Sequence, residues 1–213
     1  MHKKVISNRN EREMMEIWEV FSIVGTISFS LQGGLIAMEE KYDLFAVYLF
    51  GIITAFGGGA LRHIIIGELN YDLWNQGVLF YTAIASITLI LLFPTFFLKS
   101  RILWANVLDA IGIIAFAIQG SMAALTMNLP VSAVVVAVLL TATGGGIFRD
   151  ILSQRRPILL GENIYGLWIF LVGLIIGVGW APTNTRLIVL FGVFTALRLL
   201  TYFFDWKIPY RRF

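Results

Sequence analysis

Long runs of apolar residues, separated by short polar segments, dominate this chain. A helix needs about 20 mostly apolar residues to cross the hydrocarbon core of a bilayer. The runs predict seven membrane-spanning helices, at Trp18–Met38, Leu44–His63, Gly77–Leu98, Leu103–Met127, Val131–Arg149, Ile164–Ala181 and Leu187–Phe204. We therefore predict an all-α membrane protein with a polar N-terminal tail, residues 1–17, and a basic and aromatic C-terminal tail, residues 205–213.

The composition supports a membrane protein and narrows the chemistry. Hydrophobic residues make up 58% of the 213 residues and charged residues 14%, whereas a soluble domain carries about 25% charged residues. The absence of cysteine excludes disulfides and thiolate metal sites, and two histidines form no metal-ligating set. The net charge of +3 is modest, and its basic residues flank apolar runs. This pattern fits orientation in a bilayer rather than binding of nucleic acid, and we expect no cofactor.

Two segments return at a fixed offset of 87 residues. The triplet Gly57–Gly59 returns as Gly144–Gly146, since 144 − 57 = 87, and Arg62 returns as Arg149. Glycine weakens a helix because it loses the most backbone freedom on ordering. We therefore predict that the second and fifth spans are broken at the triplets. The alternative is close packing, in which small residues let neighbouring helices approach each other.

The repeat extends beyond the triplets. Gly25–Gly33 in the first span matches Gly112–Gly120 in the fourth, and the same offset pairs Gln32 with Gln119. Residues 18–98 thus form one three-span repeat and residues 103–181 a second, with the seventh span, 187–204, outside both. Because three is odd, the second copy must enter the membrane from the opposite side, which predicts an inverted 3+3 repeat plus one helix.

Several polar side chains lie within the predicted spans and are candidates for a transport path. They are Gln32, Arg62, Asp109, Gln119, Arg149 and Asp150, together with the two glycine triplets. Charged groups inside a membrane are costly and commonly mark a functional site. Each has a simpler interpretation. The arginines could reach the membrane surface, the glutamines could join helices, and Asp109 could pair with Arg101 or Arg198.

At a broken helix, backbone carbonyls lack intrahelical partners and can coordinate a cation, while free N–H groups can hold an anion. The backbone of Gly57, Gly58, Gly144 and Gly145 is therefore a candidate potassium site.

Lysine and arginine in the loops indicate the orientation. The N-terminal side carries five basic residues, four of them in a tail that is also rich in glutamate: Lys3, Lys4, Arg9, Arg12 and Arg186. The other side carries eight: Lys41, Lys99, Arg101, Arg155, Arg156, Lys207, Arg211 and Arg212. The positive-inside rule then places the N-terminus outside the cell and the C-terminus in the cytoplasm.

The two Gly-Gly-Gly-x-x-Arg segments, the three-plus-three-plus-one plan and Gly112–Gly120 resemble the TRIC (trimeric intracellular cation) channel family, closest to its prokaryotic, glycine transporter-like branch. The resemblance covers about Trp18 to Phe204. The Arg-Asp ending of the prokaryotic motif is present at Arg149–Asp150 but is Arg62–His63 in the first copy. The resemblance implies a homotrimer in the cell membrane. It also implies one ion path per subunit, lined by the second and fifth spans, which bend at the triplets.

Two functions stay open on these residues. Channel members of the family imply potassium conduction, which backbone carbonyls would suit, whereas related bacterial proteins are assigned glycine uptake. Two arginines beside the path would repel a cation and suit a carboxylate. We favour conduction of monovalent cations, with transport of glycine or another small amino acid as the alternative. An enzyme is disfavoured, because no nucleophile–base pair or metal set stands out. A purely structural protein would leave the repeated triplets unexplained.

Overall fold

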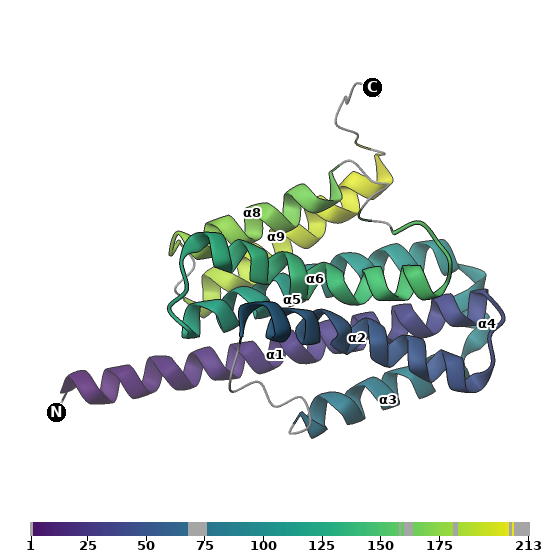
Figure 1. Cartoon of the computed structure of the whole chain (residues 1–213), viewed down its shortest axis with the longest axis horizontal. Helices are drawn as coiled ribbons and strands as arrows, with labels where there is room; N and C mark the ends of the chain where they lie inside the picture. Colours follow the sequence, from purple (N-terminus) through teal and green to yellow (C-terminus); the bar gives the residue numbers. More distant parts are fainter. Residues whose placement is uncertain are drawn as a thin grey trace.

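The computed structural model describes residues 2–67, 76–157, 159, 164–180, 183–204 and 206, with side chains from residue 16 onward. Within these residues the fold is all-helical (Figure 1). The helices are α1 (His2–Glu39), α2 (Leu44–Ile66), α3 (Gly77–Leu92), α4 (Pro94–Lys99), α5 (Arg101–Thr126), α6 (Val131–Leu152), α8 (Tyr165–Gly177) and α9 (Asn184–Phe203). The backbone of α1 is already helical from His2, before the predicted span at Trp18.

Among the described residues, five helical stretches are long and apolar enough to cross a bilayer, so the chain is a multi-pass membrane protein. They are Glu16–Glu39 of α1 and the whole of α2, α5, α6 and α9. The apolar helices α3 and α8 have 16 and 13 residues. At about 1.5 Å per residue they are shorter than the roughly 30 Å hydrocarbon core. The count of seven full spans is therefore not confirmed.

The third and sixth predicted spans are shorter than the apolar pattern suggested. The third, Gly77–Leu98, is divided, because α3 ends at Leu92 and Pro94 starts α4. Proline has no N–H to continue a helix and fits a first helical position. The sixth ends at Gly177, where Gly179 adopts a left-handed φ of 81° and the Trp180 N–H bonds to the Ile175 carbonyl at 3.2 Å. Glycine adopts this conformation readily and ends helices in this way.

The predicted breaks at the glycine triplets are not confirmed. Helix α2 runs unbroken from Leu44 to Ile66 and α6 from Val131 to Leu152, each passing through its triplet. The physical reason is that the hydrocarbon core of a membrane offers no water to hydrogen-bond an opened backbone. Each glycine costs a helix about 1 kcal/mol relative to alanine, but an opened backbone in a membrane would lose hydrogen bonds that no water replaces.

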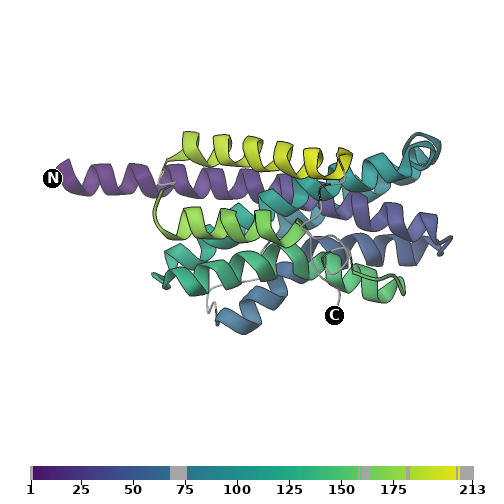
Figure 2. The same ribbon diagram turned by 90° about the horizontal axis from the view of Figure 1, so that it is seen from above.

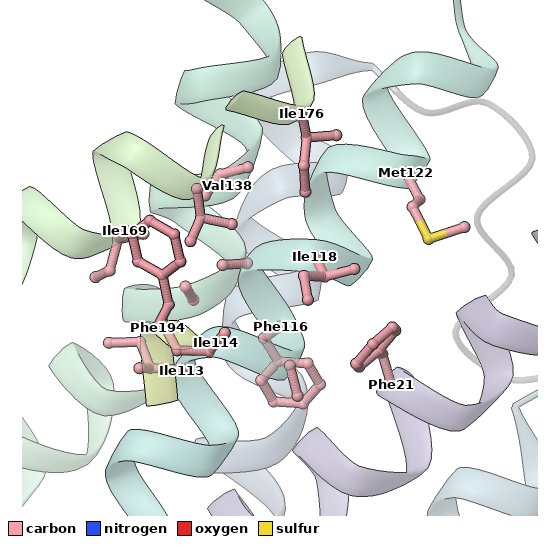
Figure 3. Close-up of a cluster of buried hydrophobic side chains, with 14 of the residues drawn as sticks. Phe21, Ile113, Ile114, Phe116, Ile118, Met122, Val138, Ile169, Ile176 and Phe194 are labelled. Carbon is pink, nitrogen blue, oxygen red and sulfur yellow. The ribbon is translucent and has the colours of Figure 1, made fainter. Parts of the chain in front are cut away.

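Four helices form the centre of the molecule, with α1 packed on α5 and α2 on α6. Figure 1 shows α3 on one side of these four helices and α8 and α9 on the other, and Figure 2 shows the same bundle from above. The main apolar cluster fills the space between α1, α5, α6, α8 and α9. Figure 3 shows its side chains converging, among them Phe21, Phe116, Val138, Ile169 and Phe194.

Equivalent residues of the two copies contact each other reciprocally. A Cβ added to Gly25 of α1 would lie 2.6 Å from the Phe116 ring of α5, and a Cβ on Gly112 would collide in the same way with Phe29. The two rings meet edge to face with centroids 5.1 Å apart. Advancing along α1 from Gly25 to Phe29 means moving back along α5, so the helices are antiparallel. This is the geometry that an inverted repeat requires.

Candidate functional site

The glycine triplets form the crossing of α2 and α6. A Cβ on Gly58 would collide with the Thr141 carbonyl oxygen, and a Cβ on Gly145 would collide with the Thr54 carbonyl oxygen. These contacts are reciprocal, since 58 + 87 = 145 and 54 + 87 = 141. Any side chain at either glycine would force the helices apart, so the structure supports the close-packing interpretation of the triplets.

The continuous helices also bear on the predicted potassium site. Backbone carbonyls inside an unbroken helix are already hydrogen-bonded to the following turn. The carbonyl groups of Gly57, Gly58, Gly144 and Gly145 therefore do not form the freed set that a broken helix would offer to a cation.

The threonines just before the triplets contribute to the same centre, and the sequence analysis did not nominate them. The Thr54 hydroxyl donates to the Phe50 carbonyl at 2.6 Å, and the Thr141 hydroxyl donates to the Ala137 carbonyl at 2.7 Å. Each hydroxyl oxygen lies 2.5 Å from where a Cβ would stand on Gly33 or Gly120. Their recurrence at the 87-residue offset is the sequence feature that could have identified them as part of the site.

Arg149 of the second repeat binds Gln32 of the first. Its Nη1 donates to Gln32 Oε1, and its Nε donates to Asp150 Oδ1 at 2.8 Å. Asp150 also forms an ion pair with Arg149 Nη2 at 2.7 Å. Arg149 and Asp150 are only 1% and 3% exposed. Arg149 therefore lies inside the protein and does not reach the membrane surface.

The reciprocal bond is also present. Arg62 of the first repeat is 1% exposed, and its Nη1 donates to Gln119 Oε1 of the second at 2.9 Å. It also donates to Thr141 Oγ1 at 3.4 Å. Each arginine thus binds the glutamine of the opposite copy. Two pairs of candidate residues, far apart in the sequence, meet between α1 and α6 and between α2 and α5.

Asp109 connects this centre to the helices outside the central four. Its Oδ1 accepts from Gln32 Nε2 at 3.1 Å and from the Tyr165 hydroxyl at 3.2 Å, and its Oδ2 lies 3.5 Å from Arg198 Nη2. Arg198 lies over the Tyr165 ring, with Cζ 4.4 Å from its centroid. Of the two possible partners, Asp109 therefore pairs with Arg198, while Arg101 pairs with Glu39 at 3.2 Å.

The position equivalent to Asp109 in the first copy is Ser22, whose hydroxyl donates to the Trp18 carbonyl at 2.7 Å. Tyr165 was not predicted as a site residue. Its equivalent in the first copy is Val78, so the repeat gave no signal for it.

The site as a whole is a buried polar network in an apolar bundle. Its charged members are each 3% exposed or less: Arg62, Asp109, Arg149, Asp150 and Arg198. Buried charges in membrane proteins pair with one another and mark substrate or ion pathways. The carboxylate and amide oxygens can coordinate a cation, and the guanidinium groups can bind a carboxylate. The network can therefore serve either class of solute.

At one end of the bundle the arginine of the loop after α6 meets the end of α1. Arg155 Nε donates to Glu40 Oε1 at 2.6 Å, and its Nη2 lies 3.1 Å from Glu39 Oε2. Burial lowers the pKa of Arg155, but the hydrogen bonds that it donates to Glu40 and Glu39, together with their negative charges, outweigh burial and raise that pKa above its ordinary value. With the Arg101–Glu39 pair, these contacts bring the first, third and fifth loops to one end, as the seven-span plan predicted.

A family model described as "Glycine transporter" matches residues 19–95 and 106–182. Both starts and both ends differ by 87, since 106 − 19 = 87 and 182 − 95 = 87. The chain is 49% identical to the UPF0126 membrane protein YvgT of Bacillus subtilis, over 92% of this chain and 97% of that protein. It is 30% identical to the UPF0126 inner membrane protein YadS of Escherichia coli K12, over 76% and 77% of the two chains.

Solved structures of TRIC channels have the same fold. A prokaryotic TRIC channel crystallised in 0.5 M KCl superposes with a TM-score of 0.83 at 25% identity, covering 91% of this chain and all of that one. A structure from work on conductance through TRIC cation channels gives a TM-score of 0.79 at 27% identity, covering 92% and 97%. The chain therefore belongs to the glycine transporter family of UPF0126 membrane proteins and is related to the prokaryotic TRIC channels.

Proposed function

We propose that this protein is a homotrimeric channel of the cell membrane that conducts monovalent cations, potassium above all, through a path in each subunit. The likeness to TRIC cation channels supports a membrane cation channel and favours transport over catalysis. The N-terminus lies outside and the C-terminus in the cytoplasm, on the distribution of loop arginines and lysines.

The observation that carries the proposal is the buried network at the α2–α6 crossing. Ions cross a bilayer only where polar groups replace their hydration shell. Gln32 and Gln119 supply amide oxygens, and Asp109 and Asp150 supply negative charge beside the arginines. The arginines hold these acceptors in place through the Arg149–Gln32 and Arg62–Gln119 bonds. The path follows α2 and α6, the two helices that carry the triplets.

The described conformation is the closed state of this path. At the crossing, Gly58 and Gly145 lie against threonine carbonyls, which leaves no room for an ion between the helices. Conduction therefore requires α2 and α6 to separate or bend at this point. The triplets favour bending, because glycine restricts the backbone conformation least.

Glycine transport is the second candidate, and a different observation favours it. Two buried guanidinium groups, Arg62 and Arg149, each hold a neutral amide oxygen, which the carboxylate of a small amino acid could replace. The description of the matching family model points the same way.

Purified protein in liposomes distinguishes the two. Electrogenic potassium flux without uptake of labelled glycine is the result we expect. Saturable glycine uptake that is lost in Arg149→Ala would overturn the channel in favour of the transporter. Arg156→Ala, an exposed arginine of the loop after α6, is the control and should leave flux unchanged. Liposomes inert to both solutes would contradict both candidates.

A further inference from the structure

We propose that the ion pairs of Arg155 with Glu39 and Glu40 are a latch that closes one mouth of the path, and that the duplicated positions at the other mouth cannot form the same ion pairs. The latch is defined by these three residues. Its role as a gate rests on the proposed function, since it presupposes that a solute moves between the two repeats.

The latch joins the ends of the two helices that carry the deepest contact of the site. Glu39 ends α1, which also carries Gln32, and Arg155 follows α6, which carries Arg149. Gln32 and Glu39 are seven residues apart, about 10 Å along a helix. The Arg149–Gln32 bond thus lies directly inward of the latch. Separating α1 from α6 at this end requires both contacts to open.

Both partners are held rigidly by the backbone. After α1, Lys41 adopts a left-handed φ of 59° and the Tyr42 N–H bonds to the Ala37 carbonyl at 3.0 Å. After α6, Gln154 has a φ of 56° and the Arg155 N–H bonds to the Asp150 carbonyl at 2.9 Å. Non-glycine residues rarely adopt this conformation, and here it caps each helix end. Arg155 is therefore fixed to Asp150, the partner of Arg149.

Glu39 and Glu40 lie at the C-terminal end of α1, where the helix dipole disfavours a negative charge. Arg155 offsets this disadvantage for both Glu39 and Glu40. Arg101 also pairs with Glu39 at 3.2 Å, so losing Arg155 would leave Glu39 with that partner but would remove the ion pair of Glu40 and weaken the hold on the end of α1.

The repeat shows that the latch belongs to one end only. The positions equivalent to Glu39 and Glu40 are Thr126 and Met127, and the position equivalent to Arg155 is Glu68. The same ion pairs cannot form at the opposite mouth. These ion pairs therefore distinguish this mouth from the other.

Opening of the latch can be measured without transport. Ser153 is buried two residues before Arg155, its hydroxyl donates to the Asp150 carbonyl at 3.1 Å, and the chain has no cysteine, so Ser153→Cys gives one reporter thiol. We measure its rate of reaction with a water-soluble maleimide in detergent-solubilised protein. Arg155→Gln should speed labelling about fivefold, the effect of losing partly exposed ion pairs on a two-state equilibrium. The double variant Glu39→Gln/Glu40→Gln removes the acidic partners of Arg155 and should speed labelling about fivefold as well.

Two variants serve as controls. Arg155→Lys keeps the charge and should retain the slow labelling. Arg156→Gln removes the neighbouring charge, and Arg156 makes no ion pair with any residue that the structure describes, so labelling should not change. Equal labelling of the wild type and both charge-removing proteins would overturn the latch, as would equal acceleration by Arg156→Gln.

Potassium flux in liposomes then tests the role as a gate. Flux should rise about fivefold in Arg155→Gln, in parallel with labelling. Faster labelling with unchanged flux would contradict a gate at this mouth. If the wild type carries neither potassium nor glycine, the proposed function fails, while the labelling rates still decide whether the latch holds this end closed.

Discussion

Gly58 and Gly145 matter because they have no side chain. Gly58 and Gly145 let α2 and α6 approach until backbone touches backbone, and the reciprocal contacts hold both copies at the same point. The third glycine of the second triplet, Gly146, is different. A Cβ there would meet only the end of Arg149 at 3.7 Å, an ordinary contact distance. Gly145 and Gly146 can therefore be substituted in parallel, one at a crowded position and one at an open position of the same helix.

We expect Gly145→Ala to destabilise the protein by about 1–3 kcal/mol, because the added methyl collides with the Thr54 backbone and overpacks the crossing. Gly146→Ala should be neutral or slightly stabilising, since alanine favours a helix. Thermal unfolding in detergent measures both. Equal effects of the two substitutions would show that helix propensity, rather than the collision, controls this position.

Gln32 and Gln119 are equivalent in the sequence but not in their surroundings. Gln32 accepts from Arg149 and donates to the Ala105 carbonyl at 2.9 Å and to Asp109. Gln119 accepts from Arg62, and Asp109 has Ser22 as its counterpart in the first copy.

Gln32→Ala should therefore destabilise the protein more than Gln119→Ala, by roughly 1–2 kcal/mol, because it leaves more buried groups without a partner. Chemical unfolding of both variants in the same detergent checks this. A larger loss in Gln119→Ala would mean that the Asp109 contact contributes little.

The sequence identified these candidate residues but not their partners. The 87-residue offset relates Gln32 to Gln119 and Arg62 to Arg149. The contacts, however, run across the copies, from Gln32 to Arg149 and from Gln119 to Arg62. The offset shows which positions of the two copies are equivalent. Which side chains contact each other depends on the angle at which the antiparallel helices cross, and that angle cannot be read from a single sequence. For Asp109 the sequence offered two partners, Arg101 and Arg198, because buried opposite charges in a membrane tend to pair. The structure pairs it with Arg198.

At the scale of helices, the apolar runs predicted where the chain crosses the membrane, and the exceptions have physical causes. Helix propensity predicts breaks at the triplets, but the membrane preserves backbone hydrogen bonds, and the glycines serve close packing instead. Pro94 divides α3 from α4 inside an apolar run, where hydropathy alone shows no boundary. Tyr165 at the start of α8 has no repeat counterpart to reveal it.

The helix outside the repeats, α9, is joined to α5 by the Arg198–Asp109 pair and to α8 by Trp168 Nε1, which donates to Thr201 Oγ1 at 3.0 Å. Because both charges of the pair are buried, removing one leaves the other in an apolar bundle. Losing one partner should therefore destabilise the packing of this helix more than losing both partners together.

Asp109→Asn and Arg198→Gln should each destabilise the protein by roughly 3 kcal/mol, and the double variant by clearly less than their sum. A double-mutant cycle on thermal unfolding measures the difference. Arg186→Gln, at an exposed position on the same helix, is the control and should have little effect. Strict additivity would show that the two groups do not interact.

At the scale of the whole molecule, the reciprocal contacts make the two repeats antiparallel, and the ion pairs of Glu39, Arg101 and Arg155 gather three loops at one end. The sequence predicted this arrangement from an odd number of spans per copy. It did not establish that α3 and α8 reach across the bilayer, because their helices are short.

Single cysteines in the cysteine-free chain test the arrangement. Tyr42→Cys, Ser100→Cys and Arg156→Cys lie at exposed positions in the gathered loops, and Thr126→Cys and Trp180→Cys at exposed positions at the other end. With a membrane-impermeant maleimide, the first three should react only in inverted vesicles and the last two only in intact cells. Labelling of either group from both sides would contradict the topology.

The unequal chemistry of the duplicated positions has a consequence for current. Asp150 stands where the first copy has His63, and Asp109 where it has Ser22, so one half of the proposed path is more acidic than the other. A conductor with such a fixed charge gradient rectifies: at equal and opposite voltages it passes more current in one direction. The proposed pore would therefore distinguish inward from outward current.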